Sequence, residues 1–453
     1  MRPYRIAALL LVAAVTVSAP VRAGSERSVP ASVDEPSTAT PIEHFLFLMQ
    51  ENHSFDNYFG TYPGADGPPA GTCMPIDSED PGSGCIAPSH VGNRAVTDLS
   101  HSRKTFERQF ADGAMNGFVS GFDDLEAGEI AMAYYDDRDL PWYWNIADNY
   151  VLFDRFFSSS ASGSVSNHMY WVSGMPGATY ELDTVPPEGW GDDIPTIFDR
   201  LEAAGISWKF YIQNYDPTVD IRAGRLNERF AQVVWVPPLA MDRFLDDERL
   251  ASRIVDMSEY YADVENDTLP AVAFLVPSGA SEHPPGRVQA GEAFVRTLVG
   301  SLMRSDAWWS SAFMWSYDDW GGFYDHVSPP SVDSHGYGFR VPALLVSPYA
   351  WAGRVDSTTL DFTSGLAFIE ENWGIEPLSD RDAAANSFMS AFDFDSPPRP
   401  PVLLPASRTI NEPDDVNTAV LYAAYATPVA MLGALVTIGH RRRRDPDGVE
   451  GEV

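Results

Sequence analysis

Six short, mostly apolar runs recur along the chain, and their spacing constrains the fold more than any other feature. Each run has the length of a buried strand, and they occupy residues 44–49, 150–153, 207–212, 271–276, 312–317 and 342–346. Longer segments with helical spacing lie between or after them, at 197–204, 241–261, 291–303 and 364–371. Strands that are apolar throughout are buried on both faces, so this alternation predicts an α/β fold in which helices cover both sides of a largely parallel sheet.

The composition between these runs divides the chain into parts. The folded domain is predicted over residues 41–390, and its long polar stretch at about 60–145 is predicted to be an insertion or cap above the sheet edge. Residues 24–40 are rich in Ser, Thr, Pro and Ala and are predicted to form a flexible leader. Residues 391–417 are rich in Pro and Asp and are predicted to form an extended stalk.

The two ends of the chain predict export and membrane anchoring. Residues 1–23 combine two early arginines, a short apolar stretch and a small-residue ending, which is typical of a cleaved signal peptide. Residues 418–439 carry no charge and are long enough to cross a bilayer as a helix. The arginines at 441–444 predict that the tail, residues 440–453, is cytoplasmic. The sequence thus predicts a single-pass protein of the cell membrane whose folded domain is extracellular; an N-terminal anchor and a buried C-terminal helix are the alternatives.

The charge balance excludes two kinds of partner surface. The 30 Lys and Arg residues against 64 Asp and Glu residues give a net charge of −34. No broad basic surface is therefore predicted that could neutralise the phosphates of a nucleic acid. The same excess of acid opposes electrostatic docking on an anionic lipid surface.

The two cysteines, Cys73 and Cys85, lie in a stretch rich in Gly and Pro. An exported chain meets an oxidising compartment, so we expect them to form a local disulfide.

Acidic and amide side chains follow two of the predicted strands directly. Glu51 and Asn52 come after the run at 44–49, and Asp318 and Asp319 come after the run at 312–317. Ligands of open α/β sheets bind at the carboxyl ends of the strands, and oxygen ligands of this kind suit a hard divalent cation. Two adjacent carboxylates at a buried strand end also repel each other, which a cation relieves. The sequence therefore predicts a divalent metal ion, which could be Ca²⁺, Mg²⁺ or a transition metal.

A hydroxyl and a histidine follow two further strands. The run at 150–153 leads to Ser164 in a loop of small residues, and the run at 271–276 leads to His283. A metal beside Ser164 would lower the pKa of its hydroxyl and favour nucleophilic attack. By composition alone, the loop fits a linker as well as it fits a nucleophile loop.

Four segments resemble motifs of one enzyme family. Residues 41–60 (PIEHFLFLMQENHSFDNYFG) resemble the opening motif of the bacterial phospholipase C and acid phosphatase family of phosphoesterases. Residues 162–167 (SGSVSN), 317–330 (YDDWGGFYDHVSPP) and 336–342 (GYGFRVP) resemble later motifs of that family, in the same order. The family is distantly related to the alkaline phosphatases and sulfatases, so the resemblance implies an alkaline phosphatase-like α/β/α sandwich.

The resemblance also implies roles for single residues in phosphate-ester cleavage. The metal-binding positions of the family correspond to Glu51, Asn52, Asp318 and Asp319. Ser164 corresponds to the hydroxyl nucleophile, and His101 and His283 correspond to histidines that contact the phosphoryl group or protonate the leaving oxygen. His326 lies within a motif and is included as a further catalytic residue.

The nucleophile motif departs from the usual pattern of the family. Gly163 and Ser166 stand where two prolines are usual, and His168 stands where Arg is common. A shifted alignment would make Ser162 or Ser166 the nucleophile in place of Ser164.

Two functions follow as alternatives. The first is a membrane-anchored, exported phosphoesterase acting on soluble phosphate esters or phospholipid headgroups, with the acidic surface favouring soluble esters. The second is a catalytically inactive cell-surface binding protein that keeps the fold.

Overall fold

The computed structural model describes residues 37–406, apart from residues 81, 93, 95, 178, 179, 181, 226 and 228. The predicted signal peptide (1–23), most of the predicted leader, the predicted membrane segment (418–439) and the tail lie outside the described residues. Among the helices that are described, none is both long enough and apolar enough to span a bilayer.

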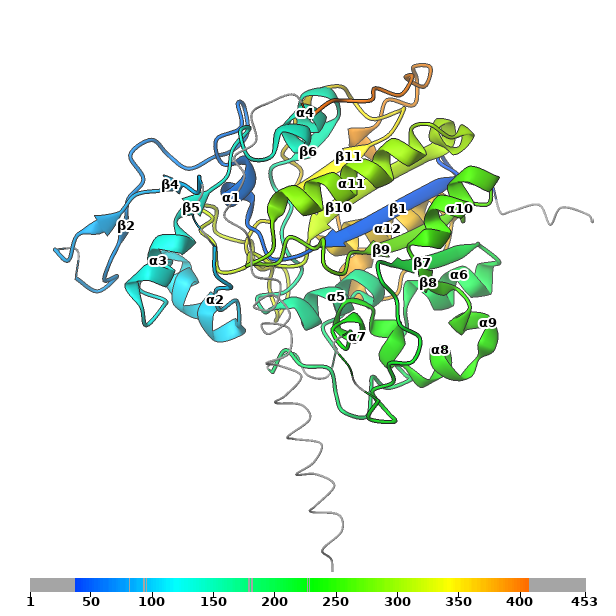
Figure 1. Ribbon diagram of the computed structural model, residues 1–453, viewed down its shortest axis with the longest axis horizontal. Helices are drawn as coiled ribbons and strands as arrows, with labels where there is room; N and C mark the ends of the chain where they lie inside the picture. The colour runs from blue at the N-terminus through cyan, green and yellow to red at the C-terminus, as the bar shows by residue number, and fades with distance from the viewer. Residues whose placement is uncertain are drawn as a thin grey trace, which may run out of the picture. The chain divides into compact units, whose positions relative to one another are not determined.

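A sheet of eight strands forms the centre of the domain (Figure 1). The strands lie in the order β12 (Arg354–Asp356), β6 (Val151–Phe153), β11 (Ala343–Val346), β10 (Ser311–Tyr317), β1 (His44–Gln50), β9 (Val272–Val276), β7 (Trp208–Ile212) and β8 (Ile254–Asp256). Strand β11 runs antiparallel to both of its neighbours, and the other adjacent pairs are parallel. The predicted α/β fold with a largely parallel sheet is confirmed, and each of the six apolar runs contains a strand.

Helices cover both faces of this sheet, as the sequence predicts (Figure 1). One face of the sheet is covered by α5 (Ser164–Ser173), α6 (Ile197–Ala204) and α12 (Phe362–Trp373), which pack on aromatic side chains of β1 and β9. The ring centroid of Trp171 in α5 lies 5.6 Å from that of Phe47 and 4.7 Å from that of Phe274. On the opposite face, α4 (Pro141–Asn149), α10 (Ser258–Asn266) and α11 (Val288–Leu302) cover the sheet, and Trp142 stacks on Trp315 at 6.0 Å. The shorter helices are α1 (Phe55–Phe59), α2 (Arg103–Phe110), α3 (Leu125–Ala131), α7 (Gln232–Trp235), α8 (Asp242–Asp246), α9 (Glu248–Ala251) and α13 (Asp380–Ala383).

The segment at 241–261, which the sequence predicts as one helical segment, is interrupted twice. It contains α8, α9, β8 and the start of α10. Asp247 separates the first two helices because its backbone is extended and its carboxylate caps α9 by accepting from the amides of Arg249 and Leu250. Strands β8 (IVD) and β12 (RVD) contain charged residues, so they lack the apolar run that marks the equally short β6 (VLF) and the longer strands.

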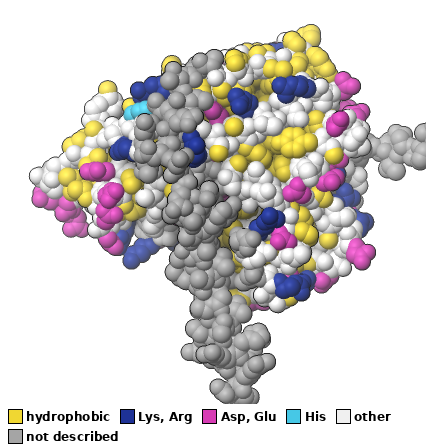
Figure 2. Space-filling model, in the orientation of Figure 1, with side chains coloured by type: hydrophobic (Ala, Val, Ile, Leu, Met, Phe, Trp, Pro, Cys, Tyr) yellow, Lys and Arg dark blue, Asp and Glu magenta, His cyan; other side chains and the backbone are white. Residues whose placement is uncertain are grey.

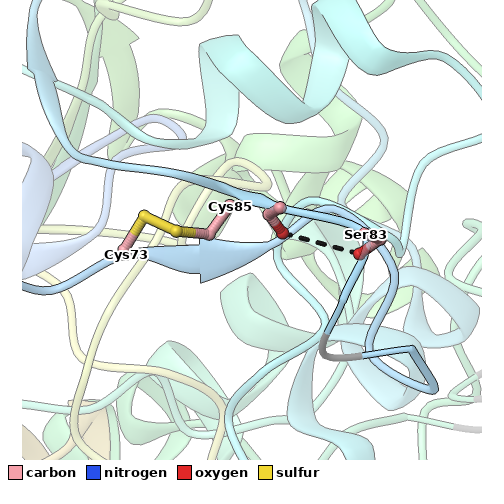
Figure 3. Close-up of a disulfide and its surroundings, with 4 residues drawn as sticks. Cys73, Ser83 and Cys85 are labelled. Atoms are coloured by element: carbon pink, nitrogen blue, oxygen red, sulfur yellow. Dashed lines mark hydrogen bonds between the residues drawn. A yellow bond between two sulfur atoms is a disulfide. The ribbon is translucent and has the colours of Figure 1, made fainter.

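The predicted insertion forms small elements beside the sheet (Figure 1). It contains β2 (Met74–Pro75), β3 (Cys85–Ile86), β4 (Ser89–His90), β5 (Ala133–Tyr134), α2 and α3. Cys73 and Cys85 form the predicted disulfide, with Cα atoms 5.5 Å apart, at the start of the β2–β3 hairpin (Figure 3). A separate apolar cluster joins the insertion to the rest of the domain: Phe106 and Phe118 of the insertion pack on Phe339, which lies outside it.

The described part of the predicted stalk lies against the domain. Phe392 is 6% exposed and stacks on Phe368 of α12, and the ring of Phe394 packs on Tyr349. The guanidinium of Arg399 donates to the carbonyl oxygens of Asn149 at 3.2 Å and Ala350 at 2.7 Å. Through these two aromatic rings and one arginine, the described part of the predicted stalk packs against the domain and does not extend away from it. On the face drawn in Figure 2, several acidic side chains gather at the left edge, and acidic and basic side chains both occur over the rest of the face.

Candidate active site

The adjacent parallel strands β1 and β10 deliver the predicted metal ligands to one edge of the sheet. Gln50 pairs in register with Tyr317, so Glu51 and Asn52 leave β1 at the level where Asp318 and Asp319 leave β10. The backbone amide of Asn52 donates to Oδ1 of Asp318 and its side-chain amide donates to Oδ1 of Asp319, both at 2.9 Å.

Tight backbone packing holds this arrangement in place. Asn52 has a φ of +64°, a left-handed conformation that Asn tolerates better than most residues. A Cβ on Gly321 would lie 2.0 Å from the carbonyl oxygen of Asn52, so only glycine fits the turn after Asp319.

The four side chains are buried and carry polar atoms that need a partner. Glu51 is 2% exposed, and Asn52, Asp318 and Asp319 are fully buried. Among the described residues, neither Oδ1 of Asn52 nor Oδ2 of Asp318 has a hydrogen-bond partner. Burial, reinforced by the charge of Asp319, raises the pKa values of Glu51 and Asp318 well above the usual range of carboxyl groups. Unpaired oxygens among mutually repelling carboxylates fit a divalent cation.

His168 joins this cluster, although the sequence identifies it only as a departure from the family pattern. Its Nε2 lies 3.2 Å from Oε1 of Glu51 and 3.9 Å from Oδ2 of Asp318. Glu51, His168 and Asp318 each offer one possible ligand atom, and these atoms lie within 4.8 Å of one another. Burial lowers the pKa of His168, which favours the neutral ring. His168 follows Ser164 by four positions on α5, so helical spacing was the signal that could have found it.

Ser164 is the first residue of α5, and its hydroxyl lies at the edge of the acidic cluster. Its Oγ donates to Oδ2 of Asp319 at 3.5 Å, and the residue is half-buried. Ser162 is fully buried and donates to the carbonyl oxygen of Tyr180, and Ser166 is 1% exposed. Of the three serines, Ser164 combines access to solvent with contact to an acid of the cluster.

His101 and His283 lie together beside these residues. Their ring centroids are 5.8 Å apart, and each ring directs Nδ1 to a backbone carbonyl oxygen, that of Leu99 at 2.8 Å and that of Pro284 at 2.7 Å. A carbonyl oxygen only accepts, so each Nδ1 carries the proton and Nε2 is directed elsewhere. Burial lowers the pKa of His283. Burial also opposes the charged form of His101, but the carboxylates of Asp319, Asp98 and Asp318 outweigh it and raise its pKa to about 9.

His326 contacts a different group of charged residues. Its Nδ1 donates to Oδ2 of Asp56 at 2.7 Å, and its Nε2 lies 3.4 Å from Oδ1 of Asp66. The buried guanidinium of Arg340 donates to Asp56 and to Asp325, each at 2.9 Å. These contacts join α1 to the loops after β10, and Asp56, Asp325 and His326 form a second group of possible metal ligands apart from the acidic cluster. The structure does not bring His326 to Ser164, and its catalytic role stays a prediction.

The site thus combines acids at a sheet edge, a serine hydroxyl at the start of a helix and two histidines. This combination fits a hydrolase that attacks esters. Comparison with known proteins narrows this class. The sequence model of the Phosphoesterase family matches residues 42–376, and the chain belongs to that family. The resemblance seen in the motifs is thus confirmed.

Two relatives in the sequence comparison are named as phospholipases C. Phospholipase C B of Mycobacterium tuberculosis is 30% identical over 430 residues, which cover 81% of this chain and 80% of that protein. The non-hemolytic phospholipase C of Pseudomonas aeruginosa is 26% identical over 422 residues, covering 80% of this chain and 58% of that protein. A solved structure from the alkaline phosphatase superfamily, from Vibrio parahaemolyticus, covers 90% of each chain at 12% identity and a TM-score of 0.38. The protein is a phosphoric ester hydrolase.

Proposed function

We propose that this protein is a metal-dependent phosphoesterase with an alkaline phosphatase-like site, in which Ser164 is the nucleophile and the substrates are phosphate esters of the kind that phospholipases C cleave. The observation that carries the proposal is that Asp319 contacts both the predicted nucleophile and a predicted metal ligand. One oxygen of Asp319 accepts from the Ser164 hydroxyl at 3.5 Å and the other accepts from the Asn52 amide at 2.9 Å. The nucleophile and the unpaired oxygens of the acidic cluster therefore adjoin each other.

Five side chains would hold the divalent cation. These are Glu51, Asn52, Asp318, Asp319 and, through Nε2, His168. A bound cation supplies positive charge that lowers the pKa of a nearby hydroxyl and stabilises negative charge on phosphoryl oxygens.

The chain's own groups perform the remaining steps. Asp319 orients the Ser164 hydroxyl and accepts its proton. The serine oxygen forms a bond to phosphorus while the bond from phosphorus to the ester oxygen breaks. The charged form of His101 donates a proton to that leaving oxygen or a hydrogen bond to the phosphoryl group. Water then hydrolyses the phosphoserine and releases the phosphate product, restoring the Ser164 hydroxyl.

Replacing the nucleophile tests this proposal. Ser164→Ala in the full chain should lower kcat for a chromogenic phosphodiester and a chromogenic monoester by at least about a thousandfold. Ser162→Ala, two residues away and buried, is the matched control and should keep most of the activity. A loss of less than about tenfold in Ser164→Ala, or about 1.4 kcal/mol, would remove Ser164 as the nucleophile.

A second candidate is a non-catalytic binding protein, and one observation favours it. Gly163 and Ser166 replace the prolines usual in the nucleophile motif, so the loop before α5 is built of small residues. The complete set of acidic and amide groups argues against it, since a binding surface has no need of unpaired buried oxygens. If the wild-type chain hydrolyses neither monoesters nor diesters with any divalent metal, from acid to mildly alkaline pH, the binding protein is the better description.

We also propose that the domain is exported and anchored in the cell membrane by residues 418–439. The support is the sequence pattern at the two ends of the chain. Protease added to intact cells should release an active fragment that ends between the domain and the membrane segment. Full protection of the domain from protease would reverse this topology.

A further inference from the structure

The loop between α5 and α6 places one more carboxylate beside the proposed nucleophile. Asp183 lies in this loop, and its Oδ1 accepts from the backbone amide of Ser166 at 3.0 Å. Its Oδ2 lies against the residue before Ser164, because a Cβ on Gly163 would be 2.4 Å from that oxygen. Asp183 has a φ of +47°, a left-handed conformation that Asp tolerates better than most residues.

The charged groups that act on Asp183 belong to the candidate active site. The residue is half-buried, burial raises the pKa of its carboxyl, and the charge of Asp319 acts in the same direction. The Ser166 amide and the charge of His101 act in the opposite direction and favour the ionised form. Asp183 lies outside the four family motifs, and its carboxylate is hydrogen-bonded to the N-terminal turn of α5.

This position matters because it is where a phosphoryl group would approach. A group attacked by Ser164 lies at the start of α5, and the amides at the start of a helix attract anions. Asp183 already uses the amide of Ser166 and adds a negative charge there. An additional charge on the substrate's phosphoryl group would therefore meet repulsion at this side of the site.

We propose that Asp183 is a specificity-determining residue that favours singly charged phosphodiesters over doubly charged phosphomonoesters. A monoester carries close to two negative charges above its second pKa of about 6, whereas a diester carries one at the same pH. In a diester, the third phosphoryl oxygen bears an uncharged organic group, so Asp183 faces no second anionic oxygen. This inference rests on the proposed function, since it concerns the phosphoryl group that Ser164 attacks.

The test compares two substrates in one variant. Asp183→Asn keeps an oxygen that accepts from the Ser166 amide and removes the charge. At pH 8, the ratio of kcat/KM for p-nitrophenyl phosphate to that for bis-p-nitrophenyl phosphate should rise about tenfold in the full-length variant. Inorganic phosphate, which is mostly a dianion at this pH, should also inhibit the variant about tenfold more strongly. Asp193→Asn removes one exposed charge from the same loop and should leave both quantities unchanged.

Each other outcome has a defined meaning. An unchanged ratio, or an equal loss with both substrates, overturns charge selection by Asp183. If Asp183→Asn does not fold, Asp183→Ser gives the amide a neutral acceptor and is measured in the same way. Full activity in Ser164→Ala would refute the proposed nucleophile, whereas an unaltered affinity of Asp183→Asn for inorganic phosphate would refute the inference alone.

Discussion

Replacing Arg340 should destabilise the domain more than any change at the surface. Its side chain is fully buried and its guanidinium satisfies four acceptors. Two are carboxylates, those of Asp56 and Asp325, each at 2.9 Å. The other two are the carbonyl oxygens of Asp66 at 2.9 Å and Asp154 at 2.7 Å. Arg340→Met keeps much of the volume and removes every one of these donors.

The size of the effect follows from these contacts. Removing one partner of a buried ion pair costs about 3–5 kcal/mol, because the remaining charge is left buried and unpaired. Burial already raises the pKa of Asp325 to about 6 with Arg340 present, and without the guanidinium this pKa should rise further. When the pKa of an acid is higher in the folded state than in the unfolded state, the protein becomes less stable as the pH rises from the unfolded pKa to the folded pKa. The loss in Arg340→Met should therefore be about 4 kcal/mol at pH 8 and clearly smaller at pH 5.

Urea unfolding followed by tryptophan fluorescence measures this difference at both pH values. Arg340→Lys keeps the charge but cannot reach four acceptors from one nitrogen, so we expect an intermediate loss of about 2 kcal/mol. Arg225→Met is the control: that side chain is 64% exposed and pairs with Asp220, and its loss should cost less than about 1 kcal/mol. If Arg340→Met lies within about 1 kcal/mol of wild type at pH 8, the network does not contribute as argued.

Two further predictions concern buried carboxyl groups. Glu292 is 3% exposed and accepts from the amides of Trp142 and Tyr143 at the start of α4, and burial raises its pKa from 4.5 to about 7. Glu292→Gln keeps an acceptor for these amides and removes the charge. In urea unfolding, the variant should therefore be about 2 kcal/mol more stable than wild type at pH 8 and equally stable at pH 4.5. A difference in stability that does not depend on pH would contradict this. Divalent metal at 100 times its Kd should stabilise the wild type by about 2.7 kcal/mol. Asp318→Asn should lose that stabilisation while being at least as stable as wild type in chelator. Thermal unfolding of both proteins with and without metal measures this. If metal raises the unfolding temperature of the wild type no more than that of Asp318→Asn, the acids do not bind a cation.

The sequence by itself determined six of the eight strands and the edge of the sheet where acidic and amide side chains meet. The long strands of a parallel sheet are buried on both faces, so their residues form continuous apolar runs that are readable without any partner. Glu51, Asn52, Asp318 and Asp319 follow such runs directly, and neighbouring parallel strands must bring them to the same edge. Local order along the chain therefore implied proximity in space, and the motifs added Ser164, His101 and His283.

Other parts of the site depend on contacts that no local pattern encodes. His168 reaches Glu51 only because α5 packs on the sheet with that side of the helix toward β1. Asp183 reaches the start of α5 only because its loop folds back on the helix, and His326 joins Asp56 and Asp66 from a segment about 260 residues away in the chain. The short strands β8 and β12 are likewise defined by the neighbours with which they pair. Tertiary structure decided these features, because packing between distant segments, and not the periodicity of any one segment, sets which side chains meet.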